Sequence, residues 1–251
     1  MLKNIIYYVL NLSFHNFDKE LFKILKNNNN ITIFDIGCFK GVFFKKFYNS
    51  RLFKNRKIKF HLFDINPNVK KYLKDYINKK NIFYKYLALG NKNKIQNYNF
   101  NTSFEASGSS MANLYKNDKS WILSRNLFLK FFFQKTSGYK KIKVPVCTFD
   151  SYVKKNRIKN IDIVKIDVDG SEEDVLMGMK NSLKKKIIKS MQLEITGNKI
   201  NFQNKEKKII KFLKKNNLYL KDSKKIISVS LFSSLKCTEN LFILKNKLSW
   251  Q

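Results

Sequence analysis

One stretch of the chain constrains its fold more than any other: residues 165–179, KIDVDGSEEDVLMGM. An apolar run ends here in acidic residues, and the chain then turns at Gly170 into a segment with helical periodicity. Near-continuous apolar runs of this kind are typical of strands that are buried on both faces of a parallel sheet. The stretch therefore predicts an α/β protein with carboxylates at the carboxyl end of a central strand.

A second unit of strand, turn and helix lies upstream, in ITIFDIGCFKG. Its β-branched run at 31–36 stops at Gly37, and helical periodicity begins near Gly41. Glycine lets the backbone turn sharply and approach a ligand closely. The first turn of the helix offers unpaired N–H groups and the positive end of the helix dipole. This corner is suited to a nucleotide-like ligand.

An acidic residue, Asp64, ends the next apolar run at 58–63. A carboxylate at this place can accept hydrogen bonds from both hydroxyls of a ribose. We therefore expect the first strand to supply a glycine turn and the second a ribose-binding carboxylate. Asp35, just before Gly37, has an alternative interpretation as an acid that caps the amides of its own loop.

The spacing of the glycines distinguishes between two cofactors that contain ribose. A nicotinamide dinucleotide requires a glycine two residues after Gly37, so that the pyrophosphate can approach the backbone, but Phe39 stands there. The pattern from Asp35 to Gly41, Asp-Ile-Gly-x-x-x-Gly, suits a ligand with a ribose and no pyrophosphate, such as S-adenosylmethionine. A merely structural turn is the alternative.

Several blocks from about residue 31 to about residue 197 resemble, in order, the FkbM family of S-adenosylmethionine-dependent methyltransferases. They are FDIGCFKG at 34–41, FDINPN at 63–68, YLALGNK at 86–92, SGSSMANL at 107–114, VPVCTFDSYV at 144–153 and VKIDVDGSEEDVLMGM at 164–179. The resemblance implies a Rossmann-like class I methyltransferase fold. Its sheet would be mainly parallel and seven-stranded, with a reversed strand near the C-terminus.

The resemblance also assigns expected cofactor-binding residues: Asp35, Gly37, Gly41, Asp64, Asn66 and Ala88. The chain departs from the family pattern at Asp169 and Asp64, where glutamate is usual, and at Ser171, where alanine is usual. Ile65 also intervenes before the Asn-Pro pair of the second block. The two aspartates keep the charge but shorten its reach, so these departures concern the fine geometry more than the identity of the cofactor.

Ligands of open α/β sheets bind at the carboxyl ends of the strands, so the chemistry is expected there. Asp167 and Asp169 are the candidate catalytic bases, with Glu194 as a further candidate, because a shielded carboxylate can take the proton of an acceptor hydroxyl. A structural role remains open for Asp169. Lys165 is expected to form an ion pair with Asp167, since a buried lysine needs a partner.

We expect no metal site, although carboxylates at two strand ends could hold a hard cation that orients a diol. Thr196 and Gly197 follow the later strand, where an Asp-Asn pair would favour such a cation. The three cysteines are far apart and lack metal-ligand spacing, which indicates a reducing cytoplasm.

The 251 residues are expected to form one domain. Within it, 1–30 would be helical, and 91–147 would be a long insert without a periodic core that serves as a lid or acceptor site. The aromatic stretch 127–133 in this insert has three interpretations: a helix over the active-site mouth, a contact with a partner or membrane, or core.

Further elements follow from local patterns. Thr148 is predicted to cap a helix, and Ser171 with Asp174 has the spacing of a capping box. The expected strands are 31–36, 58–64, 82–88, 161–167 and 191–195, with a closing antiparallel pair at 226–232 and 239–245.

The net charge of +33, from 51 Lys+Arg and 18 Asp+Glu, suggests nucleic acid or an anionic membrane surface as a partner. The lysines, however, are spread through every segment, as a general drift in composition would produce. The family resemblance instead implies a small-molecule or glycan acceptor that is methylated on a hydroxyl. Methylation of RNA, and a non-catalytic scaffold in peripheral contact with an anionic membrane, remain as alternatives.

Overall fold

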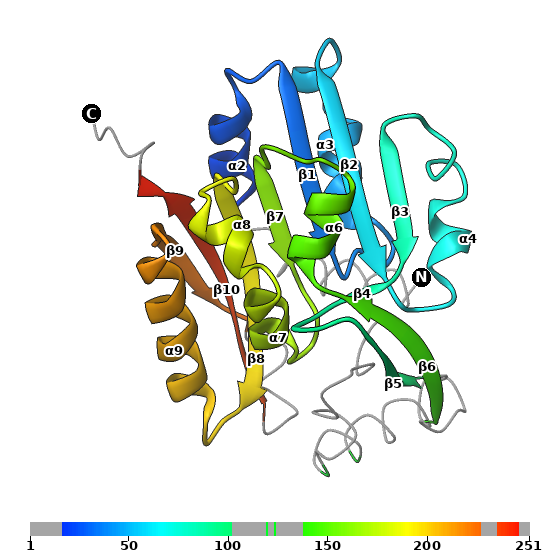
Figure 1. Ribbon diagram of the computed structural model, residues 1–251, viewed down its shortest axis with the longest axis vertical. Coiled ribbons are helices and arrows are strands. Elements are labelled where there is room, and N and C mark those ends of the chain that lie inside the picture. Colours follow the sequence, from blue (N-terminus) through cyan, green and yellow to red (C-terminus); the bar gives the residue numbers. More distant parts are fainter. Residues whose placement is uncertain (1–16, 102–118, 120–122, 124–137, 227–234, 246–251) are drawn as a thin grey trace.

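The computed structural model describes residues 17–101, 119, 123, 138–226 and 235–245. Its central sheet consists of β1 (Asn30–Ile36), β2 (Lys57–Asp64), β3 (Ile82–Tyr86), β7 (Ile163–Ile166), β8 (Ser190–Asn198), β9 (Leu218–Lys225) and β10 (Leu235–Leu244). The strand order is β3-β2-β1-β7-β8-β10-β9 (Figure 1). β10 runs antiparallel to both of its neighbours, β8 and β9, and the other pairs of strands in this sheet are parallel. The predicted Rossmann-like sheet with a reversed strand near the C-terminus is confirmed.

Helices cover both faces of this sheet (Figure 1). One face carries α6 (Phe149–Lys155), α7 (Glu172–Met177), α8 (Lys180–Lys184) and α9 (Phe202–Lys215). The other carries α2 (Asp18–Leu25), α3 (Val42–Tyr48) and α4 (Val69–Leu73), with a 3-10 helix at Arg51–Phe53. None of the helices in the described ranges is long and apolar enough to cross a membrane.

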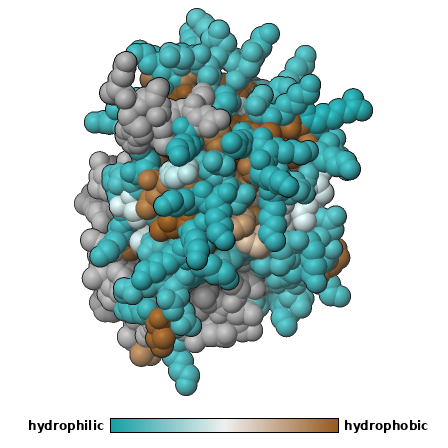
Figure 2. Space-filling view, turned by 60° about the vertical axis from the view of Figure 1, so that its left-hand side comes forward, coloured by the Kyte–Doolittle hydropathy of each residue, from teal (hydrophilic) through white to brown (hydrophobic). Residues whose placement is uncertain are grey.

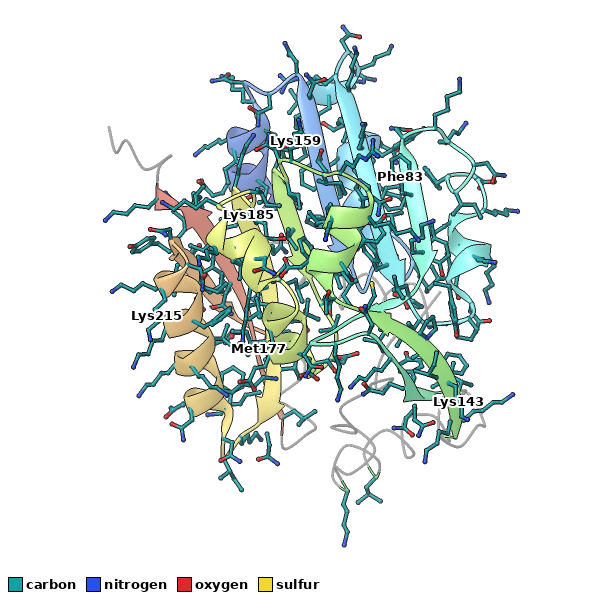
Figure 3. All side chains as sticks on the ribbon, in the orientation of Figure 1. Phe83, Lys143, Lys159, Met177, Lys185 and Lys215 are labelled. Carbon is teal, nitrogen blue, oxygen red and sulfur yellow. The ribbon has the colours of Figure 1, made fainter. Side chains whose placement is uncertain are left out.

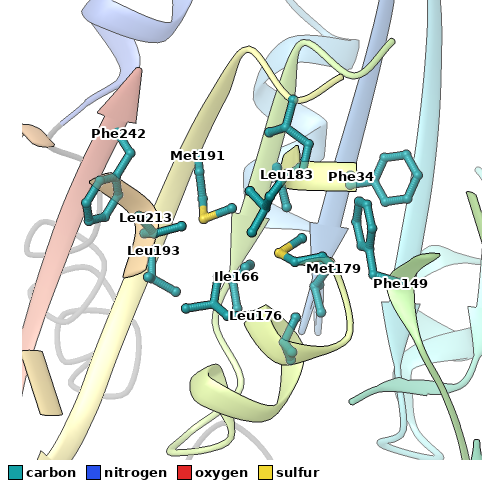
Figure 4. Close-up of a cluster of buried hydrophobic side chains, with 14 of the residues drawn as sticks. Phe34, Phe149, Ile166, Leu176, Met179, Leu183, Met191, Leu193, Leu213 and Phe242 are labelled. Atoms are coloured by element: carbon teal, nitrogen blue, oxygen red, sulfur yellow. The ribbon is translucent and has the colours of Figure 1, made fainter. Parts of the chain in front are cut away.

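Alternate residues of the strands supply two separate hydrophobic cores. In β1, Ile31 and Ile33 pack against α2 and α3, whereas Phe34 and Ile36 belong to the core under α6–α9. Figure 4 shows that second core, in which Leu176 of α7, Leu183 of α8 and Met179 of the turn between these helices face the sheet residues Ile166, Met191 and Leu193. Burial on both faces explains the continuous apolar runs of these strands.

The predicted strand at 82–88 ends earlier than expected, at Tyr86. Ala88 belongs to β4 (Ala88–Leu89), in a separate sheet of order β4-β6-β5 with β5 (Lys94–Asn101) and β6 (Tyr139–Cys147). The prediction of an insert without a periodic core is therefore wrong at both of its ends. Alternating apolar residues such as Tyr98 and Val144 form a small core there. The serine cluster and the stretch 127–133 lie outside the described residues.

Most of the other predicted elements agree with the structure to within a few residues. The Thr148 cap is confirmed, because its Oγ1 accepts the Ser151 N–H at 3.1 Å. The closing antiparallel pair is β9 and β10, so its first strand precedes the predicted run 226–232. Of the predicted strand at 226–232 the structure describes Ile226, and the prediction is wrong there because Ile226 follows the end of β9. Of the expected helical region 1–30, the structure describes α2, and Asn30 already belongs to β1.

The capping box predicted for Ser171 is wrong. Ser171 precedes α7 but its side chain makes no capping hydrogen bond. The carboxylate of Glu172 instead accepts the N–H of Gly170 at 2.6 Å. This contact fixes the turn between β7 and α7 from the helix side.

Candidate functional site

Two glycines shape the turn that follows β1. Gly37 and Gly41 have φ angles of +83° and +72°, which side-chain-bearing residues rarely adopt. A Cβ atom at Gly37 would lie 1.8 Å from the carbonyl oxygen of Asp167, so the ends of β1 and β7 are in backbone contact at this point. The N–H groups of Gly37 and Cys38 both donate to the carbonyl of Phe63, at 2.9 and 3.1 Å. The turn is therefore fixed between the ends of β2 and β7.

Asp64, at the end of β2, connects the glycine turn to the loop before α4. Its Oδ2 accepts the N–H of Phe39 at 2.7 Å, and its Oδ1 accepts the N–H of Asn66 at 2.8 Å. Burial raises the pKa of Asp64 to about 6, opposed by these backbone donors. Each carboxylate oxygen has two acceptor positions, so both retain capacity for a hydroxyl donor.

Asn66 and Ala88 lie near the same corner. The Oδ1 atom of Asn66 accepts the N–H of Asn68 at 2.9 Å, which orders the loop before α4. Ala88 packs in the small core of the second sheet together with Ile65. The structure thus brings the expected residues from β1, β2 and β4 to one corner of the molecule.

Asp35, at the end of β1, is a fully buried carboxylate. Neither of its oxygens makes a hydrogen bond with an amide of its own loop in the part of the chain that the structure describes, so the predicted cap of the loop is not formed. Burial raises the pKa of Asp35 to about 7, opposed mainly by the charge of Lys165. The amide that acts on this carboxyl group and lowers its pKa is instead that of Phe44, in the first turn of α3. A buried polar group without a partner is costly, and a ligand that donates hydrogen bonds to it would remove this cost.

The raised pKa of Asp35 predicts a pH-dependent stability. Between its usual value of 3.8 and the folded value of about 7, the folded protein keeps a proton that the unfolded chain loses. This carboxyl group therefore makes unfolding easier as the pH rises through that window, by up to about 4 kcal/mol. We expect the stability of Asp35→Asn relative to the wild type to increase over the same window. Urea unfolding at a series of pH values measures this difference.

Asp222→Asn, an exposed substitution on β9, is the control for the pH series. Its stability relative to the wild type should change little over the same range. An unchanged difference between Asp35→Asn and the wild type at both ends of the window would contradict a raised pKa at Asp35.

The predicted ion pair between Lys165 and Asp167 is confirmed, with Nζ and Oδ2 3.0 Å apart. Lys165 stands beside Asp35 on one side and Gln192 on the other in the strand register, so the three side chains share one face of the sheet. Burial lowers the pKa of Lys165, but Asp167 and then Asp35 more than reverse this effect, and the pKa is raised overall. Lys165 is thus a charged group within a buried acidic cluster.

Two further glutamates belong to this cluster, and the sequence revealed only one of them. Glu194 of β8 stands directly opposite Glu239 of β10 in the antiparallel register, and both are buried. The Cys237 thiol donates to Glu194 at 3.2 Å, and the Gln192 amide donates to Glu239. Burial raises the pKa of both carboxyl groups. Glu239 was missed because a strand pairing across the chain, rather than a local pattern, brings it here.

The loop after β7 holds the second candidate base. Asp169 has a φ of +48° and Gly170 one of +101°, so the loop reverses sharply. Glu172 is fully buried, and its Oε2 lies 2.5 Å from Nζ of Lys205. The same ammonium donates to the carbonyl oxygens of Gly170 at 3.2 Å and Thr196 at 2.7 Å. Lys205 therefore ties the loop to the end of β8, a contact that sequence reasoning missed.

In the described ranges, no three His, Cys, Asp or Glu side chains are arranged to hold a metal ion. The acidic cluster combines Asp35, Asp167, Glu194 and Glu239 with the ammonium of Lys165. The groups at the carboxyl edge are thus arranged for hydrogen bonding and charge complementarity.

Three comparisons relate the chain to known proteins. A family described as "Methyltransferase FkbM domain" matches residues 35–220. No curated protein matches the sequence. Among solved structures, the chain is similar to the methyltransferase FkbM from Methylobacillus flagellatus KT, with 8% identity, a TM-score of 0.49, and coverage of 84% of this chain and 44% of that one. The chain therefore spans less than half the length of that protein.

Two further solved structures are similar at low identity. The N-methyltransferase NodS from Bradyrhizobium japonicum WM9 is 8% identical with a TM-score of 0.42, and the match covers 90% of this chain and 93% of that one. M. jannaschii TYW2 in complex with AdoMet is 11% identical with a TM-score of 0.39, and the match covers 90% and 75%. The family match spans the strand ends that carry Asp35, Asp64 and Asp167, and by it the chain belongs to the FkbM family of S-adenosylmethionine-dependent methyltransferases.

Proposed function

We propose that this methyltransferase acts on a hydroxyl group of a sugar, a glycan or a secondary metabolite. The observation that carries the proposal is the acidic character of the carboxyl edge, where Asp35, Asp167, Glu194 and Glu239 surround Lys165. Lys165, the cation of this cluster, is already paired with Asp167, so the cluster leaves it no free charge for a polyanionic acceptor, despite the net charge of +33. A neutral polyol needs only hydrogen-bonding groups, which the carboxyl groups supply.

The residues at the corner of β1 and β2 fit the cofactor. In this proposal the remaining acceptor positions of Asp64 bind the ribose hydroxyls, and the unpaired carboxylate of Asp35 faces the cationic part of the cofactor. The turn at Gly37 and Gly41 lets the backbone approach closely, and Asn66 and Ala88 complete the corner. When bound, S-adenosylmethionine supplies a methyl group on a positively charged sulfur.

Asp167 and Asp169 have different proposed roles. Asp167 already holds Lys165 in an ion pair, so it fixes that charge at the end of β7. Asp169 lies further along the loop, where the backbone has a positive φ, and is the proposed base that takes the proton of the acceptor hydroxyl. The ion pair between Glu172 and Lys205 holds this loop in place.

We expect Asp169→Asn to lower kcat by about 100-fold, because the amide cannot accept the proton. The affinity for S-adenosylmethionine should change little. Release of S-adenosylhomocysteine with a panel of sugars, glycans and hydroxylated metabolites measures the rate, and a short RNA is included in the panel. Glu173→Gln, a half-buried change on α7 that removes only an ion pair with the exposed Lys208, is the matched control.

Two outcomes would contradict this proposal. A wild-type rate of methyl transfer in Asp169→Asn would show that Asp169 is not the base. Methylation of the RNA alone would show that the acceptor is a nucleic acid. A peripheral contact with an anionic membrane also remains a proposal, which rests on the net charge and on the stretch 127–133.

A further inference from the structure

We infer that the protein carries a second binding site, for a nucleoside phosphate. This site lies at the amino ends of the parallel strands, at the end of the sheet opposite the cofactor corner. A pocket of about 410 Å³ opens there. It is lined by Asn30, Thr32, Lys59, His61, Phe83, residues 156–160, Asp162 and Lys189. Its volume falls within the usual range for small-molecule sites.

This pocket is separate from the cofactor corner. Asn30 and Thr32 lie at the start of β1, whereas Asp35 lies near its end. The seven residues of β1 span about 20 Å at the usual rise of a strand. In Figure 3, Lys159 and Phe83 lie toward the upper end of the sheet, and Met177 lies toward the lower end. A ligand in the pocket therefore leaves the cofactor corner open.

Positive charge dominates the lining. Asp162 is the acid of the pocket, and it is already satisfied: Oδ1 accepts from Asn28 at 2.9 Å and from Lys189 at 2.5 Å, and Oδ2 accepts the N–H of Thr32 at 2.8 Å. Asp162 thus neutralises Lys189.

No carboxylate in the described part of the chain pairs with Lys59, Arg157 or Lys159. Three positive charges therefore remain available to an anion, and arginine and lysine bind phosphate through charge-assisted hydrogen bonds.

The floor of the pocket is neutral and aromatic. The ring of His61 stacks between Phe34 and Phe83, with ring centroids 4.6 and 4.8 Å apart. Its Nδ1 hydrogen-bonds with the hydroxyl of Tyr152 at 2.9 Å. Burial lowers the pKa of His61 to about 4, so this ring is uncharged at neutral pH. Phe83 is 37% exposed, and its ring offers an apolar surface to a flat base.

The arrangement of these groups selects the ligand class. Cations at the rim suit a phosphate, and a neutral floor with aromatic rings and the polar side chains of Asn30 and Thr32 suits a nucleoside. Figure 2 shows that hydrophilic residues cover most of one face of the protein, so charge alone does not define a site. The site is defined by the combination of a pocket, three cations without an acidic partner and an aromatic floor.

The test is calorimetric titration of the full chain with ADP, in the presence of saturating S-adenosylmethionine so that the cofactor corner is filled. We expect one ADP per chain. The double variant Arg157→Ala with Lys159→Ala should weaken ADP binding by about tenfold or more. Adenosine, which lacks the phosphates, should bind about tenfold more weakly than ADP to the wild type.

A matched control removes two lysines from α9, with Lys211→Ala and Lys215→Ala, both exposed and outside the pocket. It should bind ADP within about twofold of the wild type. Thermal unfolding of both double variants checks that they are folded. Equal losses in the two double variants, or no binding of ADP to the wild type, would overturn the inference. Tight binding of a short RNA without binding of ADP would overturn it as well.

This inference does not depend on the proposed acceptor. Release of S-adenosylhomocysteine measures methyl transfer, which takes place at the carboxyl ends of the strands. ADP titration measures binding to the second site, at the amino ends of the strands. A protein that methylates sugars but ignores ADP would refute the inference alone. A protein that binds ADP but methylates none of the acceptors would refute the proposed function alone.

Discussion

Gly37→Ala should destabilise the protein by more than about 3 kcal/mol and abolish cofactor binding. Gly37 has a φ of +83°, which costs a side-chain-bearing residue free energy before any contact is considered. The new Cβ would also lie 1.8 Å from the carbonyl oxygen and 2.9 Å from the carbonyl carbon of Asp167. Both are backbone atoms that cannot rotate away, so β1 and β7 would have to separate at the site itself.

Urea unfolding measures the loss of stability, and Gly197→Ala is its control. Gly197 lies near the end of β8, and the nearest atom to a Cβ there would be 3.5 Å away, an ordinary contact. That variant should lie within about 1 kcal/mol of the wild type. Equal unfolding midpoints for Gly37→Ala and Gly197→Ala would contradict the close approach of the two strands.

Asp64→Asn should weaken S-adenosylmethionine binding by about 100-fold or more. Both carboxylate oxygens accept backbone N–H groups, from Phe39 and Asn66. An amide replaces one of these acceptors with a donor, so one loop loses its contact and the proposed ribose acceptor is lost as well. Asp64→Glu restores the usual family residue and should keep binding within about tenfold.

Calorimetric titration of the folded variants with S-adenosylmethionine measures these affinities. Asp75→Asn, an exposed acid in the turn after α4, is the control and should bind as the wild type does. If Asp64→Asn bound as tightly as Asp75→Asn, the cofactor would not depend on the corner between β1 and β2.

The parallel strands of the central sheet could be predicted because their apolar runs are buried on both faces and end at Gly37, Asp64 or Gly170. The same strand ends also revealed most of the candidate site. The small sheet was missed because β5 contributes only Tyr98 and Phe100 to a small core, and these two residues alternate with asparagines, which are uncommon in strands.

Local sequence patterns could not predict contacts between segments that are distant in the chain. Glu239 faces Glu194 only through the antiparallel register of β10, and Lys205 reaches Glu172 only when α9 packs beside β8. The predicted capping box also failed: the Ser171 side chain makes no capping hydrogen bond, and the turn before α7 is held by Glu172, which accepts the N–H of Gly170.

The central claim is that the corner between β1 and β2 binds S-adenosylmethionine, and titration of the wild-type protein tests it most directly. Calorimetry with S-adenosylmethionine, beside a matched titration with NAD, compares a ligand without a pyrophosphate with one that needs a second glycine where Phe39 stands. We predict one bound S-adenosylmethionine per chain and no binding of NAD. Folded protein that binds NAD, or that gives no heat with S-adenosylmethionine, would contradict this account of the site.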